Sequence, residues 1–388
     1  PPAHPGKDVN TFEYLVKVEK QRRRILQRTS ESFWRILTHW KGTCLSLILK
    51  DGLFWTTMAI FIGIRIWLRL GSVPEFIILI ANTDVTLIGG FLSFFVVYYV
   101  GECYGRFNAA YNLCMDAEGK IFDIATLAAT NMPKESAQRL NRYLNAANIA
   151  AYTGLSLDYP HNTFFVELNK RNIFLTEEEH ARMQEVGMHD GGSPFLELCT
   201  WAMNEIGAAC RAGHITDPLL ANTMGGLILG VRGALGGLFN AADQPIHFFY
   251  VHFISLLTLM YLPLVALSLS ISAGAGNDVY WLADVVAGLT LILQDFYFIG
   301  LRLLGQNMTS PFGDDNEDLS VMHYVNFTWT MSNRILLSKF PKALDAETEA
   351  EIMKNRVSVG HAWKGETAME PSIVVDPEEK VNHIDVEK

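Results

Sequence analysis

The sequence predicts an all-α membrane protein with four transmembrane helices and a helical domain on one side of the membrane. The mean hydropathy of the 388-residue chain is +0.16, whereas the mean for soluble domains rarely rises above zero. Charged residues still make up 19% of the chain, which is too many for a protein that lies wholly in lipid. Four long apolar stretches separated by polar segments account for both observations.

The four apolar stretches are long enough to cross the hydrocarbon core of a bilayer as helices. The first is Leu53–Leu70 and the second is Val85–Tyr104. The second stretch becomes polar near Glu102, which predicts a helix that starts in lipid and continues into water. The third stretch is Phe248–Ile271 and the fourth is Val279–Leu304.

The distribution of basic residues predicts one orientation in the membrane. Lys and Arg are frequent in the N-terminal and central segments and are absent from the short connections Gly71–Asp84 and Ser272–Asp278. The positive-inside rule therefore places both termini and the central domain on the cytosolic or stromal side. The expected parts are a basic amphipathic segment (1–52), two transmembrane helices (53–104), a cytosolic helical domain (105–245), two further transmembrane helices (246–304), an acidic loop with a following helix (305–340) and an acidic tail (341–388).

Composition excludes several classes of function. The formal net charge is −10, and the tail after Phe340 holds eleven acids against six bases, which argues against a nucleic-acid partner. The five cysteines include no C-x-x-C pair, so neither a disulfide framework nor a zinc site is expected. We find no nucleophile–base constellation and no cofactor loop, and we do not expect an enzyme. Because the chain begins at Pro1 rather than Met, a fused or associated domain before it stays open.

An acidic loop a few residues beyond the fourth stretch is the most informative motif. Asp314–Asp318 holds four acids and one Asn in succession, and so many neighbouring carboxylates repel one another. A Ca²⁺ ion, which accepts six to eight oxygen ligands, would remove that cost. The run imitates the start of an EF-hand, but Leu319 stands where Gly is required and Val325 where Glu is required. Two interpretations remain, a Ca²⁺ site and a solvated acidic turn.

A second candidate site lies on the second apolar stretch. Gly90, Phe94 and Tyr98 are four residues apart and therefore share one face of a helix. Copies of this helix around a symmetry axis would form rings of aromatic side chains, a constriction that can gate by dewetting. The positive edges of aromatic rings tolerate an anion. The alternative is that the stripe serves ordinary helix packing.

Charges inside apolar segments are costly and usually have partners. Asp284 and Asp295 lie within the fourth stretch, and we expect Asp295 to pair with an Arg of another helix. Arg232 lies within the glycine-dense segment Gly225–Gly237 and is expected to carry an interior salt bridge. The small residues around it predict close helix packing rather than a phosphate-binding loop.

The chain resembles the bestrophin family of anion channels over about residues 40–335. The specific part of the resemblance is the acidic run Pro311–Leu319 directly after the last span. Weaker matches fall in the family's order: Ser93-Phe94, Tyr98-Tyr99-Val100, Arg106 with Tyr111, Asp217-Pro218-Leu219, Arg232 and Pro245–Tyr250. The chain departs from the family at three places: Gly90 stands in place of a bulky apolar residue, Phe107 and Asn108 stand where many members have two aromatic residues, and Asn316 stands among the acids.

The resemblance implies a ring of identical subunits, a pentamer, that crosses a lipid bilayer and passes chloride and bicarbonate. It implies that the second transmembrane helix lines a pore neck through Gly90, Phe94 and Tyr98. It also places a second, cytosolic aperture at Leu219.

The same resemblance implies that Ca²⁺ is the cofactor. The carboxylates of Asp315 and Asp318 would be ligands, together with the backbone carbonyls of Asn307 and Ser310. A further carbonyl would come from the N-terminal segment of a neighbouring subunit. The tail segment Pro371–Val375 is expected to dock as a strap on a neighbour.

Alternative functions stay open beside a Ca²⁺-responsive anion channel. One is a channel module whose gating is set by another domain, and another is a scaffold that does not conduct. A membrane enzyme is the least favoured, because it would require His or Glu clustered on facing helices.

Overall fold

A computed structural model describes residues 12–13, 16–17, 19–20, 34, 40, 43–71, 73–155, 159, 161–187, 194–244, 246–273, 280–313, 318–339 and 345–354. Within these ranges all regular structure is helical and no strand occurs. The chain divides into two compact units, Pro1–Leu337 and Ser338–Lys388. The predicted all-α fold class is confirmed.

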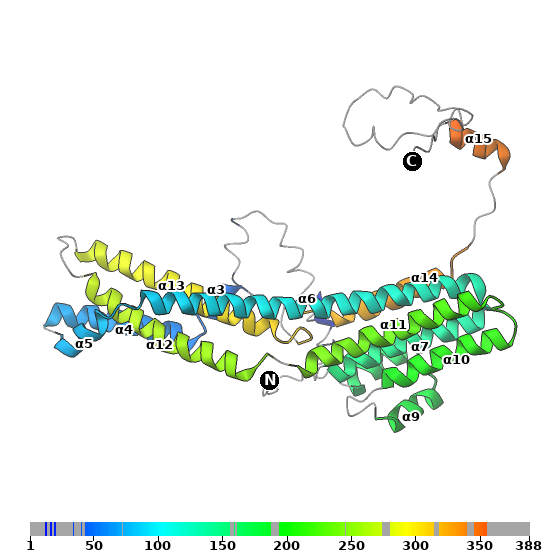
Figure 1. Ribbon diagram of the computed structural model, residues 1–388, viewed down its shortest axis with the longest axis horizontal. Coiled ribbons are helices and arrows are strands. Elements are labelled where there is room, and N and C mark those ends of the chain that lie inside the picture. The colour runs from blue at the N-terminus through cyan, green and yellow to red at the C-terminus, as the bar shows by residue number, and fades with distance from the viewer. Residues whose placement is uncertain are drawn as a thin grey trace, which may run out of the picture. The chain divides into compact units, whose positions relative to one another are not determined.

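One half of the first unit is a bundle of long apolar helices. It contains α3 (Cys44–Ile48), α4 (Gly52–Leu70), α12 (Phe248–Ser272) and α13 (Tyr280–Met308), beside the first turns of α6 (Thr86–Asn131) (Figure 1). A short helix, α5 (Glu75–Ala81), occupies the connection between α4 and α6. The side chains between these helices form one apolar core.

Five described helices are long and apolar enough to cross a membrane, judged by length and composition: α4, α6, α11 (Pro218–Asp243), α12 and α13. Four of them coincide with the four predicted spans. The fifth, α11, falls in the segment that the sequence places in the cytosolic domain.

The composition of α11 has a packing explanation. The helix runs antiparallel to the second half of α6, and its glycines meet large side chains of that helix. A Cβ added at Gly230 would lie 2.6 Å from Cε of Lys120, and one added at Gly237 would lie 3.0 Å from Cδ2 of Leu113. Close packing was the expected role of these glycines. Arg232 is exposed on this helix, so the expectation of an interior salt bridge was wrong: the helix face that carries it is not covered.

The helix α6 links the two halves of the unit. Its 46 residues correspond to a length of about 69 Å, far more than a membrane requires. It begins against α12 and α13 and continues without a break past α11, α14 (Val321–Leu336) and α7 (Lys134–Leu155) (Figure 1). The helix therefore extends 27 residues beyond Tyr104, where the predicted span ends.

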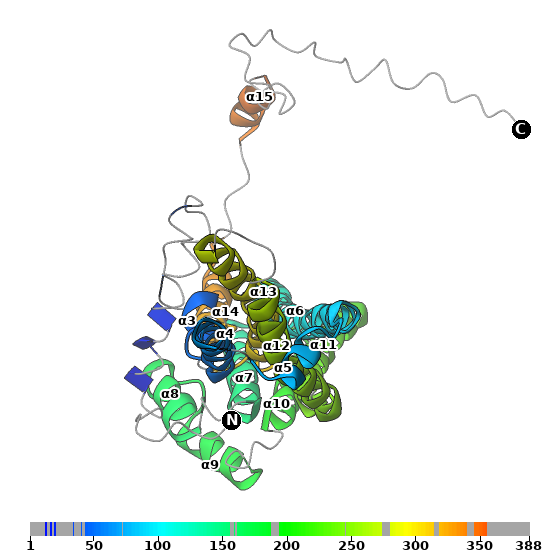
Figure 2. The ribbon, with the colours of Figure 1, turned by 90° about the vertical axis from the view of Figure 1, so that its left-hand side faces the viewer.

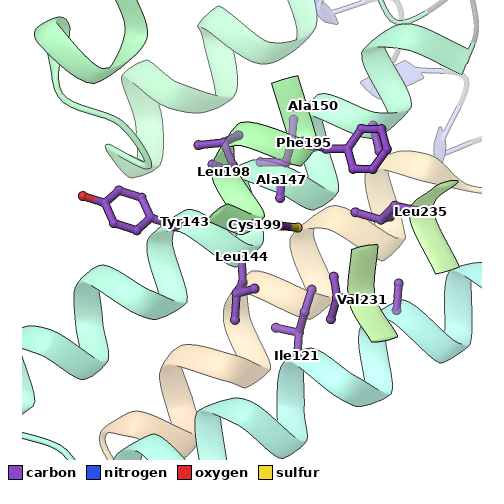
Figure 3. Close-up of a cluster of buried hydrophobic side chains, with 14 of the residues drawn as sticks. Ile121, Tyr143, Leu144, Ala147, Ala150, Phe195, Leu198, Cys199, Val231 and Leu235 are labelled. Atoms are coloured by element: carbon purple, nitrogen blue, oxygen red, sulfur yellow. The ribbon is translucent and has the colours of Figure 1, made fainter. Parts of the chain in front are cut away.

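The other half of the unit has a core of its own. Side chains of α6, α7, α10 (Pro194–Arg211) and α11 meet there, including Ile121, Leu144, Leu198 and Val231 (Figure 3). In the same view the hydroxyl of Tyr143 points out of the cluster. A π-helix, η2 (His161–Phe165), and the short helices α8 (Val166–Asn172) and α9 (Glu177–Glu185) complete this half, and α8 and α9 lie at its edge (Figure 2).

The start of α9 is fastened to α7 through Glu179. This carboxylate caps its own helix by accepting from the backbone N–H of Thr176 at 2.8 Å. It also accepts from the Tyr143 hydroxyl at 2.7 Å and pairs with Arg142 at 3.2 Å. Burial by itself would raise the pKa of Glu179, but these three partners outweigh it and the pKa is lowered.

Charged side chains join α4 to α13 inside the apolar half. Asp284 pairs with both Arg65 and Arg69. Asp295 is fully buried and accepts from the Thr57 hydroxyl at 2.7 Å. The expectation that Asp295 pairs with an Arg was therefore wrong, because the arginines of α4 reach the other acid, about three turns away.

The second unit contains one described helix, α15 (Ala346–Lys354). Asp345 opens it by accepting from the backbone N–H of Thr348 at 2.7 Å. The segment Pro371–Val375, expected to act as a strap, lies outside the described residues.

Candidate functional site

The predicted neck residues all lie on an uncovered face of α6. Phe94 is 66% exposed and Tyr98 54%, and Gly90 is exposed as well. The opposite face of the same turns is buried against α12 and α13 through Gly89, Leu92, Val96, Tyr99 and Cys103. The helix is therefore buried within its own chain on one side only, and most of the surface of its aromatic stripe stays exposed in that chain.

The adjacent glycines Gly89 and Gly90 have different environments. A Cβ added at Gly89 would lie 2.2 Å from the Tyr261 hydroxyl oxygen, so α12 packs against the bare backbone there. A Cβ added at Gly90 would meet no atom within 4 Å. The sequence alone does not separate these roles, because both glycines belong to the same apolar run.

Aromatic side chains of α12 support the neck from behind. The ring of Tyr250 meets that of Tyr98 edge-on at 6.1 Å, and its hydroxyl donates to the backbone carbonyl of Phe95 at 2.9 Å. On the α13 side, Ser93 and Tyr297 share a hydrogen bond of 2.6 Å. Sequence reasoning did not assign a role to Tyr250 or Tyr297. The aromatic run Phe248–Tyr250 indicates that this part of the chain packs against other aromatic residues, but the sequence does not show that Tyr250 contacts Phe95 and Tyr98.

Leu219 lies at the start of α11 and is 71% exposed. The local sequence explains its position: Pro218 fits the first turn of a helix, and the Asp217 carboxylate caps it by accepting from the Leu219 N–H at 2.9 Å. Because α11 runs antiparallel to α6, this start lies toward the Asn131 end of α6, remote from the neck. Along α6 the distance from Phe94 to Asn131 is about 55 Å.

The acidic loop is described on both sides of Asp314–Glu317, and the predicted ligand Asp315 lies in that undescribed gap. The loop closes through a hydrogen bond of 2.8 Å from the Leu319 N–H to the Pro311 carbonyl. Asp318 is only 7% exposed, and its carboxylate lies over Gly313, where an added Cβ would be 2.8 Å from Oδ2.

Two of the predicted ligands converge in this loop. The position of a Cβ added at Gly313 lies 3.6 Å from the Ser310 carbonyl oxygen and 2.8 Å from Oδ2 of Asp318. Asn307 is in the last turn of α13, where helix carbonyls lack partners within the helix. These donors are all oxygens, the type that a hard cation such as Ca²⁺ prefers. The described residues contain no group of three or more His, Cys, Asp or Glu suited to a metal, and Asp318 is the only acid of the run among them.

The N-terminal segment reaches the same loop. Glu19 is buried and accepts a hydrogen bond from the Ser320 hydroxyl, two residues beyond Asp318. This contact between residues 301 positions apart was not foreseen from the sequence. It places a carboxylate of the N-terminal segment near the loop within one chain.

Comparison with known proteins identifies the family of the chain. Residues 15–337 match the family described as "Bestrophin, RFP-TM, chloride channel", which covers most of the chain. No curated protein matches the chain.

Solved structures also match. A crystal structure of a bacterial bestrophin homologue from Klebsiella pneumoniae with a tryptophan-to-alanine mutation has 19% identity and a TM-score of 0.61, covering 76% of this chain and 99% of that one. Another structure of the homologue, phased by Zn-SAD, has 18% identity, a TM-score of 0.58 and coverage of 76% and 97%. A crystal structure of a membrane protein with a proline-to-alanine mutation has 18% identity, a TM-score of 0.59 and the same coverage. The chain belongs to the bestrophin family of chloride channels.

Proposed function

We propose that this chain is one subunit of a homo-oligomeric anion channel, a pentamer, with α6 innermost. The observation that carries the proposal is the uncovered face of α6 at Gly90, Phe94 and Tyr98. The opposite face of α6 is buried within the chain, and the outward surfaces of Phe94 and Tyr98 are exposed. Repeating the helix around an axis turns the uncovered face into a narrow apolar ring.

In this proposal four helices cross the membrane: α4, the first part of α6, α12 and α13. The fifth apolar helix, α11, lies in the aqueous domain, because it packs along the part of α6 beyond the aromatic stripe. The termini lie on the cytosolic or stromal side, as the basic residues predict. The permeant ions are chloride and bicarbonate, and Leu219 forms the second aperture.

Calcium is the proposed regulator. The carboxylates of Asp315 and Asp318 and the carbonyls of Asn307 and Ser310 would hold one ion per subunit. The convergence of the Ser310 carbonyl and the Asp318 carboxylate supports this ligand set. Because Glu19 contacts the end of the same loop, an ion bound there would fasten the N-terminal segment as well as the end of α13.

The test of conduction is a bilayer recording of the reconstituted full chain. Phe94→Ala removes the apolar ring and should increase open probability and weaken discrimination between chloride and sodium by at least about twofold. Phe76→Ala is the matched control, because it removes a similarly exposed ring from α5, away from the α6 face. If Phe94→Ala leaves gating and selectivity like those of the wild type, α6 is not innermost. A wild-type oligomer that passes no current would instead favour the scaffold.

A further inference from the structure

The uncovered face of α6 continues far beyond the neck. From Leu87 to Thr130 the positions on this face follow one another at steps of three or four residues, the spacing of a single helix side. All of them are exposed or partly exposed, although the opposite side is buried along the whole helix. The face is aromatic and apolar as far as Tyr98. Beyond it, the positions on this face are glycines or polar residues, and the polar ones are Asn108, Asn112, Asp116, Asp123, Thr126 and Thr130.

Between Asn108 and Thr130 this face carries two acids and no base. Asp116 is neutralised, because Lys120 on the next turn pairs with it while lying across Gly230 of α11. Asp123 is exposed and has no ion pair within the described part of the chain. The exposed base on the neighbouring helix, Arg232, lies near Cys199 of α10. One unpaired carboxylate per subunit therefore remains on the face between Asn108 and Thr130, whereas Glu102, nearer the neck, is hydrogen-bonded to Tyr98.

We infer that Asp123 is a selectivity-determining residue that opposes anion passage in the cytosolic half of the path. This inference rests on the proposed function, because it requires α6 to be innermost. A ring of unpaired carboxylates, one from each subunit, raises the local concentration of cations and lowers that of anions. The neck and this ring then act in opposite senses, since aromatic edges favour anions and the carboxylates disfavour them.

The two elements are separated by a long distance. Phe94 and Asp123 are 29 residues apart on one helix, or about 44 Å. The Debye length is about 8 Å at physiological ionic strength, so the charge of Asp123 acts on ions at its own level and not on the neck. Substitution of Asp123 should therefore change selectivity while leaving the gating of the neck unaltered.

The experiment measures reversal potentials of the reconstituted full chain under a sodium chloride gradient. Asp123→Asn is nearly isosteric and removes only the charge, and it should raise the chloride-to-sodium permeability ratio by at least about twofold. Asp123→Glu retains the charge and should keep the wild-type ratio. Glu178→Gln is the matched control, because it removes one exposed carboxylate from α9, away from the α6 face. At about 1 M salt, where the Debye length falls to about 3 Å, the difference caused by Asp123→Asn should shrink.

The outcomes separate this inference from the proposal on which it rests. An unchanged ratio in Asp123→Asn, together with altered gating in Phe94→Ala, overturns the role of Asp123 and leaves α6 as the pore helix. Unchanged recordings in both variants overturn both ideas. An equal rise in Asp123→Asn and Glu178→Gln would show that only the net charge of the protein matters, and it also overturns the role of Asp123. A Phe94→Ala effect on gating, with a salt-dependent rise confined to Asp123→Asn, supports the inference.

Discussion

The hydroxyl of Tyr250 donates to the backbone carbonyl of Phe95 at 2.9 Å and ties α12 to the middle of the neck segment of α6. A helix carbonyl that accepts from another helix fixes the rotation of α6 at this level. The ring of Tyr250 also supports Tyr98, which lies on the uncovered face. The orientation of the neck therefore depends on α12 as well as on α6.

Tyr250→Phe should test this dependence. The variant keeps the ring contact with Tyr98 and loses only the hydrogen bond, at a cost of about 1 kcal/mol. We expect a lower thermal midpoint of the purified oligomer and altered gating at unchanged ion selectivity. Tyr297→Phe, which removes the hydroxyl that faces Ser93, serves as a comparison on the α13 side. Gating equal to that of the wild type in Tyr250→Phe would mean that the hydrogen bond does not hold the neck.

Gly89 and Gly90 offer a matched pair of substitutions. Gly89→Ala places a methyl group against the Tyr261 hydroxyl and should destabilise the protein by about 1–3 kcal/mol, the usual range for overpacking. Gly90→Ala has open space and should not lower stability, because Ala is favoured over Gly within a helix, while the methyl group narrows the neck. Thermal unfolding of the solubilised oligomer measures the first effect, and single-channel conductance measures the second. Equal losses of stability in the two variants would contradict this assignment of faces.

Glu179 predicts a pH-dependent contribution to stability. Because its pKa is lowered in the folded state, its contribution is present above the ordinary value of 4.5 and is lost as the pH falls through the folded-state pKa. Glu179→Gln should therefore lower the free energy of unfolding by about 1 kcal/mol at neutral pH, and the gap to the wild type should narrow in acid. Glu178→Gln, at an exposed neighbouring position, is the control and should show no such gap. A gap that stays constant with pH would show that the carboxylate charge plays no part.

The sequence predicts those parts of the fold that depend on apolar length. The spans at α4, α12 and α13 follow from runs long enough to cross a bilayer. The end of α6 does not follow, because beyond Tyr104 the helix is amphipathic and its apolar face is buried by α7, α11 and α14. The apolar periodicity of the sequence beyond Tyr104 fits several short helices as well as it fits one long helix.

Contacts between distant residues are the part of the site that the sequence hides. An acid within the apolar run, Asp295, indicates that a partner exists, but the partner Thr57 lies 238 positions away and carries no charge. Glu19 and Ser320 are similarly remote. By contrast, the shared face of Gly90, Phe94 and Tyr98 requires only their helical spacing, and all three are exposed on that face.

The acidic loop gives the last prediction, which concerns Ca²⁺. Gly313 leaves room for the Asp318 carboxylate, since an added Cβ would lie 2.8 Å from its Oδ2. Gly313→Ala should therefore displace that carboxylate and weaken Ca²⁺ binding at least about tenfold, although no ligand is removed. Gly63→Ala, a change made where nothing lies within 4 Å, is the matched control and should bind normally.

Calorimetry on the purified oligomer measures the affinity. Replacing both Asp315 and Asp318 by Asn should weaken binding further than Gly313→Ala, because Ca²⁺ affinity follows the number of charged ligands. Wild-type protein without saturable binding below the millimolar range would leave a solvated acidic turn as the explanation of this loop. Binding that is lost in the double variant but preserved in Gly313→Ala would instead mean that the loop accommodates the added methyl group without displacing the Asp318 carboxylate. Gly313 would then be needed only for the turn conformation. Normal binding in the double variant would place any Ca²⁺ site elsewhere in the protein.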